Sequence, residues 1–179
     1  IGNCGPAIMH FASEEMKLEL LPRMASAEDV WCQLFSEPSA GSDVAGLRTK
    51  AVKDGDNWKL NGQKIWTSRA EHSDLMILLA RTTPKDKVAK RTEGLSVFIL
   101  DMREAQQNGM TIRPIETMMN HNSTEIFFDN VRVPAANLIG EEDLGFRYIL
   151  SGMNAERILI AAECIGDAKW FIKTASDYA

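Results

Sequence analysis

The chain has 179 residues, 45% of them hydrophobic and 25% charged, and a formal net charge of -5 at pH 7. This length suits one ordinary domain or two small ones. The negative charge, without runs of Lys and Arg interleaved with aromatic residues, argues against nucleic acid as a partner. No uninterrupted apolar stretch of about 18 residues occurs, so we expect no membrane span.

Cysteine and histidine positions argue against disulfide and metal scaffolds. The scattered cysteines form no Cys-x-x-Cys pair, which disfavours a disulfide framework and a zinc site. They favour a reducing compartment, either a bacterial cytoplasm or a mitochondrial matrix. The histidines do not lie at metal-ligand spacing from Cys or acidic residues, so we expect no metal. These residues are Cys4, Cys32, Cys164, His10, His72 and His121.

Helical patterns mark both ends of the chain. In residues 7–24, Ser13 before two glutamates is typical of a helix start, and Pro22 predicts a break before a second short helix. After Pro134, apolar residues return at near 3.6 spacing, which predicts a long helix broken near Asn154. The chain begins without Met and ends inside this pattern, so we interpret it as an internal fragment.

Between these ends the pattern favours β-strands. Residues 48–60 predict a strand, a turn at 54–57 and a returning strand, and Asn61-Gly62 predicts a type I′ turn into a third strand over 63–68. Further strands are expected at 75–81, 95–101, 110–115 and 125–133. The expected fold is therefore mixed α and β, with a central antiparallel β-barrel or sandwich domain flanked by helical segments.

The most informative segment is a loop of turn formers, small residues and hydroxyls, Leu34-Phe35-Ser36-Glu37-Pro38-Ser39-Ala40-Gly41-Ser42-Asp43-Val44-Ala45-Gly46. Its glycines and proline allow a tight backbone that a ligand can approach closely. Its serine hydroxyls can donate hydrogen bonds to phosphate or carbonyl oxygens. This composition predicts a loop that cradles a ligand, the alternative being a Gly/Ser-rich surface turn. We expect Glu37 and Asp43 to fix the loop by accepting backbone hydrogen bonds.

This loop resembles the signature of the FAD-dependent acyl-CoA dehydrogenases, which has Ser or Thr, Glu-Pro, two small residues, Gly-Ser-Asp and a Gly three positions on. Residues 61–68, Asn-Gly-Gln-Lys-Ile-Trp-Thr-Ser, and residues 153–157, Met-Asn-Ala-Glu-Arg, are similar to two further segments of that family. The resemblance implies the end of an N-terminal helical domain over 1–29, a middle β-domain over 30–142 and the start of a C-terminal helical domain over 143–179.

The resemblance also implies roles for individual residues. Trp66 flanks the flavin ring, Ser68 lies near its reactive edge, and Ser42 sits near the pyrophosphate and the CoA thioester. The full set of implied cofactor contacts is Leu34, Phe35, Ser36, Gly41, Ser42, Trp66, Thr67 and Ser68. The implied substrate contacts are Ser42, Arg147, Asn154 and Arg157. Taken by itself, Trp66 is better explained as a core side chain, with Ser68 as a polar strand end; its occurrence together with the 34–46 loop favours the flavin contact instead.

Glu156 is the candidate catalytic base. The family's reaction removes a proton alpha to a thioester carbonyl, which requires a carboxylate beside the alpha carbon. Most of the family supplies this Glu from a segment that would lie beyond residue 179, whereas a minority, including isovaleryl-CoA and long-chain acyl-CoA dehydrogenases, place it directly before the Arg that Arg157 matches. Two alternatives to Glu156 as base therefore stay open: a distant base, and a surface glutamate paired with its neighbour.

The resemblance implies dehydrogenation of an acyl-CoA to the trans-2-enoyl-CoA in fatty acid or amino acid catabolism, with electrons passed to an electron-transfer flavoprotein. It also implies a homotetramer or homodimer. The alternatives are an acyl-CoA oxidase or flavin monooxygenase on the same scaffold, and a non-catalytic module that binds CoA or flavin. Residues 118–123 lack the family's Gly-x-Arg pattern, so the resemblance does not define CoA contacts there. Without a Gly-x-Gly-x-x-Gly motif, we expect no Rossmann-type FAD site.

Overall fold

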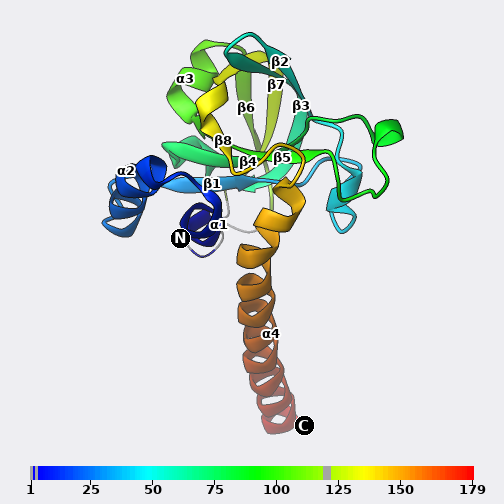
Figure 1. Cartoon of the computed structure of the whole chain (residues 1–179). Coiled ribbons are helices and arrows are strands. Elements are labelled where there is room, and N and C mark those ends of the chain that lie inside the picture. Colours follow the sequence, from blue (N-terminus) through cyan, green and yellow to red (C-terminus); the bar gives the residue numbers. More distant parts are fainter. Residues whose placement is uncertain (1, 3, 119–121) are drawn as a thin grey trace.

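The computed structural model describes residues 2, 4–118 and 122–179, so the predictions for Met119, Asn120 and His121 lie outside the described residues. Within these ranges one sheet forms the centre of the molecule (Figure 1), with strand order β6-β7-β3-β2-β4-β5-β8 and β1 added beside β4. Its strands are β1 Trp31–Leu34, β2 Lys50–Asp54, β3 Asn57–Ser68, β4 Leu75–Arg81, β5 Leu95–Asp101, β6 Met110–Ile115, β7 Ser123–Pro134 and β8 Leu138–Ile139.

The pairing of β4 bends this sheet into two halves. β4 pairs in parallel with β1 along Leu75–Leu78, and with β2 only through Arg81 and Lys50. The other pairings between these strands are antiparallel. An apolar core joins Leu78 of β4 and Phe98 of β5 to Trp58 of β3, so the halves pack face to face. The predicted mixed fold with a central, largely antiparallel barrel or sandwich and flanking helices is confirmed.

A second core lies on the outer face of β4 and β5. Ile77, Leu79 and Val97 pack there with residues of the N-terminal helices and with Ile149 of the C-terminal helix. Both faces of β4 and β5 are therefore buried, which explains why these strands are unbroken apolar runs rather than alternating ones. In Figure 1 the N-terminal helices lie against β1, and the long C-terminal helix projects away from the sheet.

The helices are α1 Cys4–Phe11, α2 Glu14–Ala25, α3 Met102–Gln107 and α4 Gly145–Tyr178. Ser13 caps α2, because its hydroxyl accepts a hydrogen bond from the Met16 amide at 3.2 Å, as its position predicted. The predicted break at Pro22 is wrong. Pro22 lies in the last turn of α2, where it removes one backbone hydrogen bond without ending the helix, and its own carbonyl accepts the Ser26 amide at 3.0 Å. The predicted break near Asn154 is also wrong, since α4 is continuous.

The turn at residues 54–57 is confirmed, but the type I′ turn at Asn61-Gly62 is wrong. β3 runs without interruption from Asn57 to Ser68, and its register with β7 shifts between Leu60 and Gly62. Gly62 has φ +151°, and a Cβ there would lie 2.5 Å from Thr49 Oγ1. The glycine therefore serves a bulge and a close backbone approach instead of a reversal.

The other predicted strands are confirmed, with the last extended to Ser123–Pro134, whereas β1, β8 and α3 were not predicted. In the described part of the chain, none of the helices is long and apolar enough to cross a membrane. Over the same residues, no group of three or more His, Cys, Asp or Glu side chains is placed to hold a metal ion.

Candidate functional site

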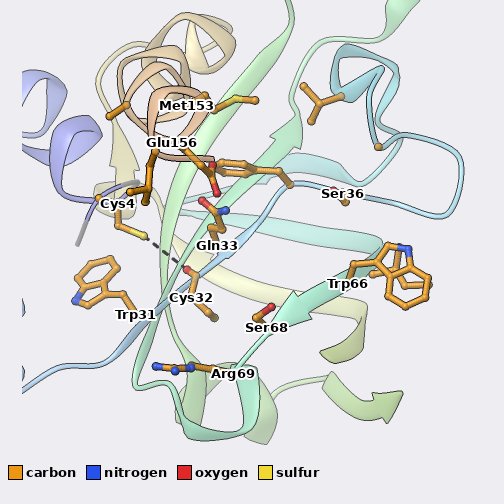
Figure 2. A pocket seen from close by; sticks show the side chains of 17 residues that line it. Cys4, Trp31, Cys32, Gln33, Ser36, Trp66, Ser68, Arg69, Met153 and Glu156 are labelled. Atoms are coloured by element: carbon orange, nitrogen blue, oxygen red, sulfur yellow. Dashed lines mark hydrogen bonds between the residues drawn. The ribbon is translucent and has the colours of Figure 1, made fainter. Parts of the chain in front are cut away.

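A cavity of about 610 Å³ lies where β1, the loop that follows it, the end of β3 and α4 meet (Figure 2). This volume is in the usual range of small-molecule and cofactor sites. In the view of Figure 2, Trp31 and Trp66 lie at opposite ends of the cavity, and Glu156 enters from α4. The lining residues are Gly2, Cys4, Trp31, Cys32, Gln33, Phe35, Ser36, Gly41, Val44, Ile65, Trp66, Ser68, Arg69, Met153, Ala155, Glu156 and Leu159.

A buried carboxylate holds the loop beneath this cavity. Glu37 Oε2 accepts the Arg48 amide at 2.6 Å, and Glu37 Oε1 accepts the Thr49 amide at 2.9 Å and the Lys64 ammonium at 2.8 Å. Burial raises the pKa of Glu37, but the Lys64 charge and these hydrogen bonds outweigh it, so the pKa lies below its ordinary value. The prediction that Glu37 fixes the loop through backbone hydrogen bonds is confirmed.

Two arginines hold the far end of the loop. The buried guanidinium of Arg81 donates to the carbonyl oxygens of Ala45 at 3.0 Å and Leu47 at 3.3 Å. Asp43 behaves differently from its prediction: its exposed carboxylate pairs with the Arg91 side chain, and no backbone hydrogen bond to it is present in the described residues. The loop is thus held by side chains from β4 and from the β4–β5 connection.

A bulge near the end of β3 presents Trp66 to the cavity. The register with β7 shifts between Lys64 and Thr67, and Trp66 has φ +61°, a left-handed conformation that is uncommon for a residue with a Cβ. Its side chain is 61% exposed. Strained backbone around a large exposed ring is typical of a binding site, where a ligand covers the ring.

The structure gathers six of the predicted site residues around one cavity: Phe35, Ser36, Gly41, Trp66, Ser68 and Glu156. Others lie elsewhere. Leu34 and Thr67 are buried and do not line the cavity, so their contacts with a cofactor stay predictions. Ser42 is exposed outside the lining.

The predicted substrate contacts on α4 also lie outside the cavity lining. Arg147, Asn154 and Arg157 are all exposed at the surface of the helix. Arg157 Nη1 donates to Asn154 Oδ1 at 2.6 Å, one turn earlier on the helix. The roles of these three residues stay predictions.

Several lining residues were not predicted, above all Trp31, Gln33 and Arg69. Trp31 and Gln33 are half-buried and alternate along β1 with the buried residues Cys32 and Leu34. This alternation with a period of two residues is the sequence signal that could have predicted them as lining residues. In the described part of the chain, Trp31 Nε1 and Gln33 Oε1 are buried without a hydrogen-bond partner. Arg69 has φ +62° directly after β3, which no sequence pattern indicated.

The cavity also holds two buried thiols, Cys4 and Cys32. Burial raises the pKa of Cys4 to about 12 and that of Cys32 to about 11. Both are therefore protonated at neutral pH and are poor nucleophiles.

Comparison with known proteins agrees with this architecture. A family model described as "Acyl-CoA dehydrogenase, middle domain" matches residues 32–131. The chain is 37% identical over 162 residues to acyl-CoA dehydrogenase FadE26 of Mycobacterium tuberculosis, covering 90% of this chain and 40% of that protein. The chain spans between 21% and 44% of the length of such curated relatives.

Solved structures are similar as well. Butyryl-CoA dehydrogenase from Megasphaera elsdenii matches with a TM-score of 0.82 and 30% identity, over 94% of this chain and 43% of that chain. The prolyl acyl carrier protein oxidase AnaB matches with a TM-score of 0.79 and 32% identity, over 88% of this chain and 40% of that chain. With the matched middle domain and the cavity between β1, β3 and α4, the chain belongs to the acyl-CoA dehydrogenase family.

Proposed function

We propose that this chain forms the cofactor- and substrate-binding part of an FAD-dependent acyl-CoA dehydrogenase. The enzyme converts an acyl-CoA thioester to the trans-2-enoyl-CoA and passes the electrons to an electron-transfer flavoprotein. One observation carries the proposal: a single cavity is lined by Ser36 of the loop, by Trp66 and Ser68 of β3 and by Glu156 of α4. These are the groups that a flavin and an acyl thioester would need side by side.

The residues around the cavity fit a flavin. Gly41 lines the cavity, and a Cβ built there would meet nothing within 4 Å, so the protein's own packing does not require a glycine at this position. A ligand lying against the backbone would require one. The exposed indole of Trp66 suits a planar ring, and the hydroxyls of Ser36 and Ser68 suit its polar edge. The chemistry that FAD supplies when bound is acceptance of a hydride from the β carbon.

The chain's own residues would hold and orient the reactants. The hydroxyls of Ser36 and Ser68 donate hydrogen bonds where negative charge develops, and Phe35 and Trp66 exclude water from the ring. Leu34 and Thr67, which directly adjoin Phe35 and Trp66 in the chain, would complete the cofactor contacts. Ser42 contacts a pyrophosphate or the thioester arm from the rim of the loop. The polar groups at the surface of α4, Arg147, Asn154 and Arg157, hold the CoA part of the substrate.

Glu156 removes the alpha proton in this proposal. Its side chain lines the same cavity as Ser36 and Trp66, and a carboxylate beside the alpha carbon is the base that the reaction needs. The proton passes to the Glu156 carboxylate while the β carbon loses its hydride. The alternative base lies on a segment beyond residue 179, and substitution of Glu156 separates the two cases.

The test mixes the purified flavoprotein with acyl-CoAs of graded chain length without oxygen and follows the flavin band at about 450 nm. We expect one length class to bleach the band rapidly. Glu156→Gln should slow bleaching by about 10² to 10⁴, the usual effect of removing a general base. Glu163→Gln is the matched control, because Glu163 is exposed farther along the same helix. A flavin that no acyl-CoA bleaches would refute dehydrogenation, and an unchanged rate in Glu156→Gln would assign the base elsewhere.

An oxidase is the second candidate, because the similar protein AnaB is described as a prolyl acyl carrier protein oxidase. In that case oxygen, instead of an electron-transfer protein, reoxidises the cofactor. The same sample distinguishes the two: rapid reoxidation on admitting oxygen favours the oxidase, and reoxidation that requires electron-transfer flavoprotein favours the dehydrogenase. A protein that binds flavin or CoA without any bleaching would favour a non-catalytic module.

We also propose that the protein works as a homodimer or homotetramer. The projecting part of α4 exposes large apolar side chains, and exposed patches of this kind mark surfaces that further protein covers. They are Ile158, Leu159, Ile160, Ile165, Trp170, Phe171 and Ile172. Light scattering of the purified protein tests the proposal, which a monomer at micromolar concentration would refute.

A further inference from the structure

A buried ion pair lies beside the cavity without lining it. The Lys64 side chain is 0% exposed and that of Glu37 is 5% exposed, and their charged atoms are 2.8 Å apart. Lys64 comes from β3 and Glu37 from the loop after β1. Because neither residue is among those that line the cavity, the pair does not contact a ligand there directly.

The pair joins the two segments that carry the proposed flavin contacts. Lys64 Nζ also donates to the Phe35 carbonyl at 3.1 Å, and the next residue of β3, Ile65, donates its amide to the Ser36 carbonyl at 3.0 Å. Trp66 follows directly. Two successive residues of β3 are therefore bonded to two successive residues of the loop, immediately before the bulge that presents Trp66.

Stability alone does not explain a charged pair at this position. Two ions taken out of water lose hydration that their attraction only partly restores, and apolar side chains of similar size often stabilise a protein as well or better. The effect is visible in Lys64, where burial lowers the pKa of the ammonium to about 8 although Glu37 opposes the shift. What the pair supplies that apolar residues lack is a single permitted geometry, because each charged atom must meet its own partners.

We propose that Lys64 and Glu37 are positioning residues that fix the 35–37 segment against the end of β3 and so set the spacing between Ser36 and the Trp66–Ser68 contacts of the flavin. This inference rests on the proposed function, in which the cavity holds FAD. If so, the pair affects flavin affinity and reduction potential more than overall stability. The reason is that a set of binding groups loses most of its effect when the groups shift by about 1 Å relative to one another.

The test compares the parent protein with Glu37→Gln and with the double variant Glu37→Gln/Lys64→Met. The double variant removes both charges and both Lys64 contacts, while the introduced glutamine retains an acceptor for the Thr49 amide. The single variant leaves the Lys64 ammonium buried beside a neutral acceptor, so we expect it to be less stable than the double variant, in which both charges are absent. The double variant is therefore the conservative case. Lys59→Met is the matched control, since Lys59 lies on the same strand and pairs with Asp54 at 3.2 Å near the surface.

Three measurements are made: the FAD dissociation constant of the apoprotein, the midpoint potential of bound flavin, and amide exchange of the apoprotein at residues 35–37 and 65–68. We expect FAD binding to weaken by about tenfold or more in the double variant, with an intermediate loss in Glu37→Gln and none in Lys59→Met. The potential should shift, and exchange should quicken at these residues without added cofactor, while the melting temperature of the double variant stays near the parental value.

The outcomes separate the two proposals. If the parent apoprotein does not bind FAD, the proposed function fails and this inference falls with it. If the parent binds FAD and both folded variants keep its affinity, potential and exchange rates, only the positioning role is overturned. A loss of FAD binding that merely follows a matching loss of melting temperature, with no change of exchange confined to these segments, would also overturn it.

Discussion

Arg81 offers the sharpest test of how the loop is held. Its side chain is 6% exposed, and its guanidinium donates to the carbonyl oxygens of Ala45 at 3.0 Å, Leu47 at 3.3 Å, Thr83 at 3.2 Å and Glu93 at 3.3 Å. Burial lowers the pKa of this guanidinium, although nearby carboxylates oppose the shift. The guanidinium stays charged and is stabilised by hydrogen bonds to these carbonyl oxygens. Replacement by Met would preserve much of the apolar stem and remove all four hydrogen bonds.

The expected loss of stability in Arg81→Met follows from two backbone carbonyl oxygens, those of Ala45 and Leu47, which would stay buried without a hydrogen-bond donor. A buried carbonyl left without a donor costs about 1 to 3 kcal/mol, so Arg81→Met should lower the free energy of unfolding by about 2 to 6 kcal/mol. Urea unfolding at 25 °C, followed by tryptophan fluorescence and circular dichroism, measures this difference.

Arg132→Met is the control for this experiment. The Arg132 side chain is 64% exposed and pairs with Asp54 at 3.3 Å, so its loss should change the free energy of unfolding by about 0 to 1 kcal/mol. The reasoning is refuted if the free energy of unfolding of Arg81→Met falls by less than about 1 kcal/mol, or by no more than that of the control. The carbonyl oxygens would then form hydrogen bonds with water in place of Arg81.

Three further predictions concern acid stability, thiol reactivity and backbone approach. The pKa of Glu37 is lower in the folded protein than in the unfolded chain, so the unfolded chain binds more protons. The Glu37 carboxylate therefore contributes its full stabilisation above the unfolded pKa, and this contribution is lost as the pH falls through the folded pKa. Urea midpoints from neutral to acidic pH should therefore decline less steeply in Glu37→Gln. Cys4 and Cys32, with pKa values raised to about 12 and about 11, should resist iodoacetamide at pH 8 and react only after unfolding, as peptide mass spectrometry would show. Gly62→Ala should lower the free energy of unfolding by about 1 to 3 kcal/mol, because its Cβ would lie 2.5 Å from Thr49 Oγ1; an unchanged urea midpoint would contradict the close approach.

Elements with strong local signals were predictable. The strands over 75–81, 95–101 and 110–115 have the predicted bounds, because apolar or β-branched runs between turn formers leave few alternatives. The cap at Ser13 was predictable for the same reason, since its hydroxyl bonds an amide three residues away. Each of these features depends on residues close together in the sequence.

The wrong predictions share a long-range cause. Asn61-Gly62 has the composition of a type I′ turn, but pairing with β7 and contact with Thr49 extend the strand through it. β1 is only Trp31–Leu34, and its strand character comes from parallel pairing with Leu75–Leu78 of β4. Pairings between distant segments override local propensity in such short or ambiguous stretches.

The candidate site divides in the same way. The composition of the 34–46 loop and the resemblance of three motifs were enough to predict Ser36, Trp66 and Glu156 as site residues, since these segments carry their own chemical signature. Their convergence on one cavity, and the placement of Gln33 and Arg69 beside them, depends on how β1, β3 and α4 pack. The ion pair between Lys64 and Glu37 likewise joins residues 27 positions apart in the sequence. Local sequence patterns specify which chemical groups a segment carries. Burial and long-range strand pairing specify which of those groups come together, because the free energies of burial and pairing depend on residues far away in the sequence.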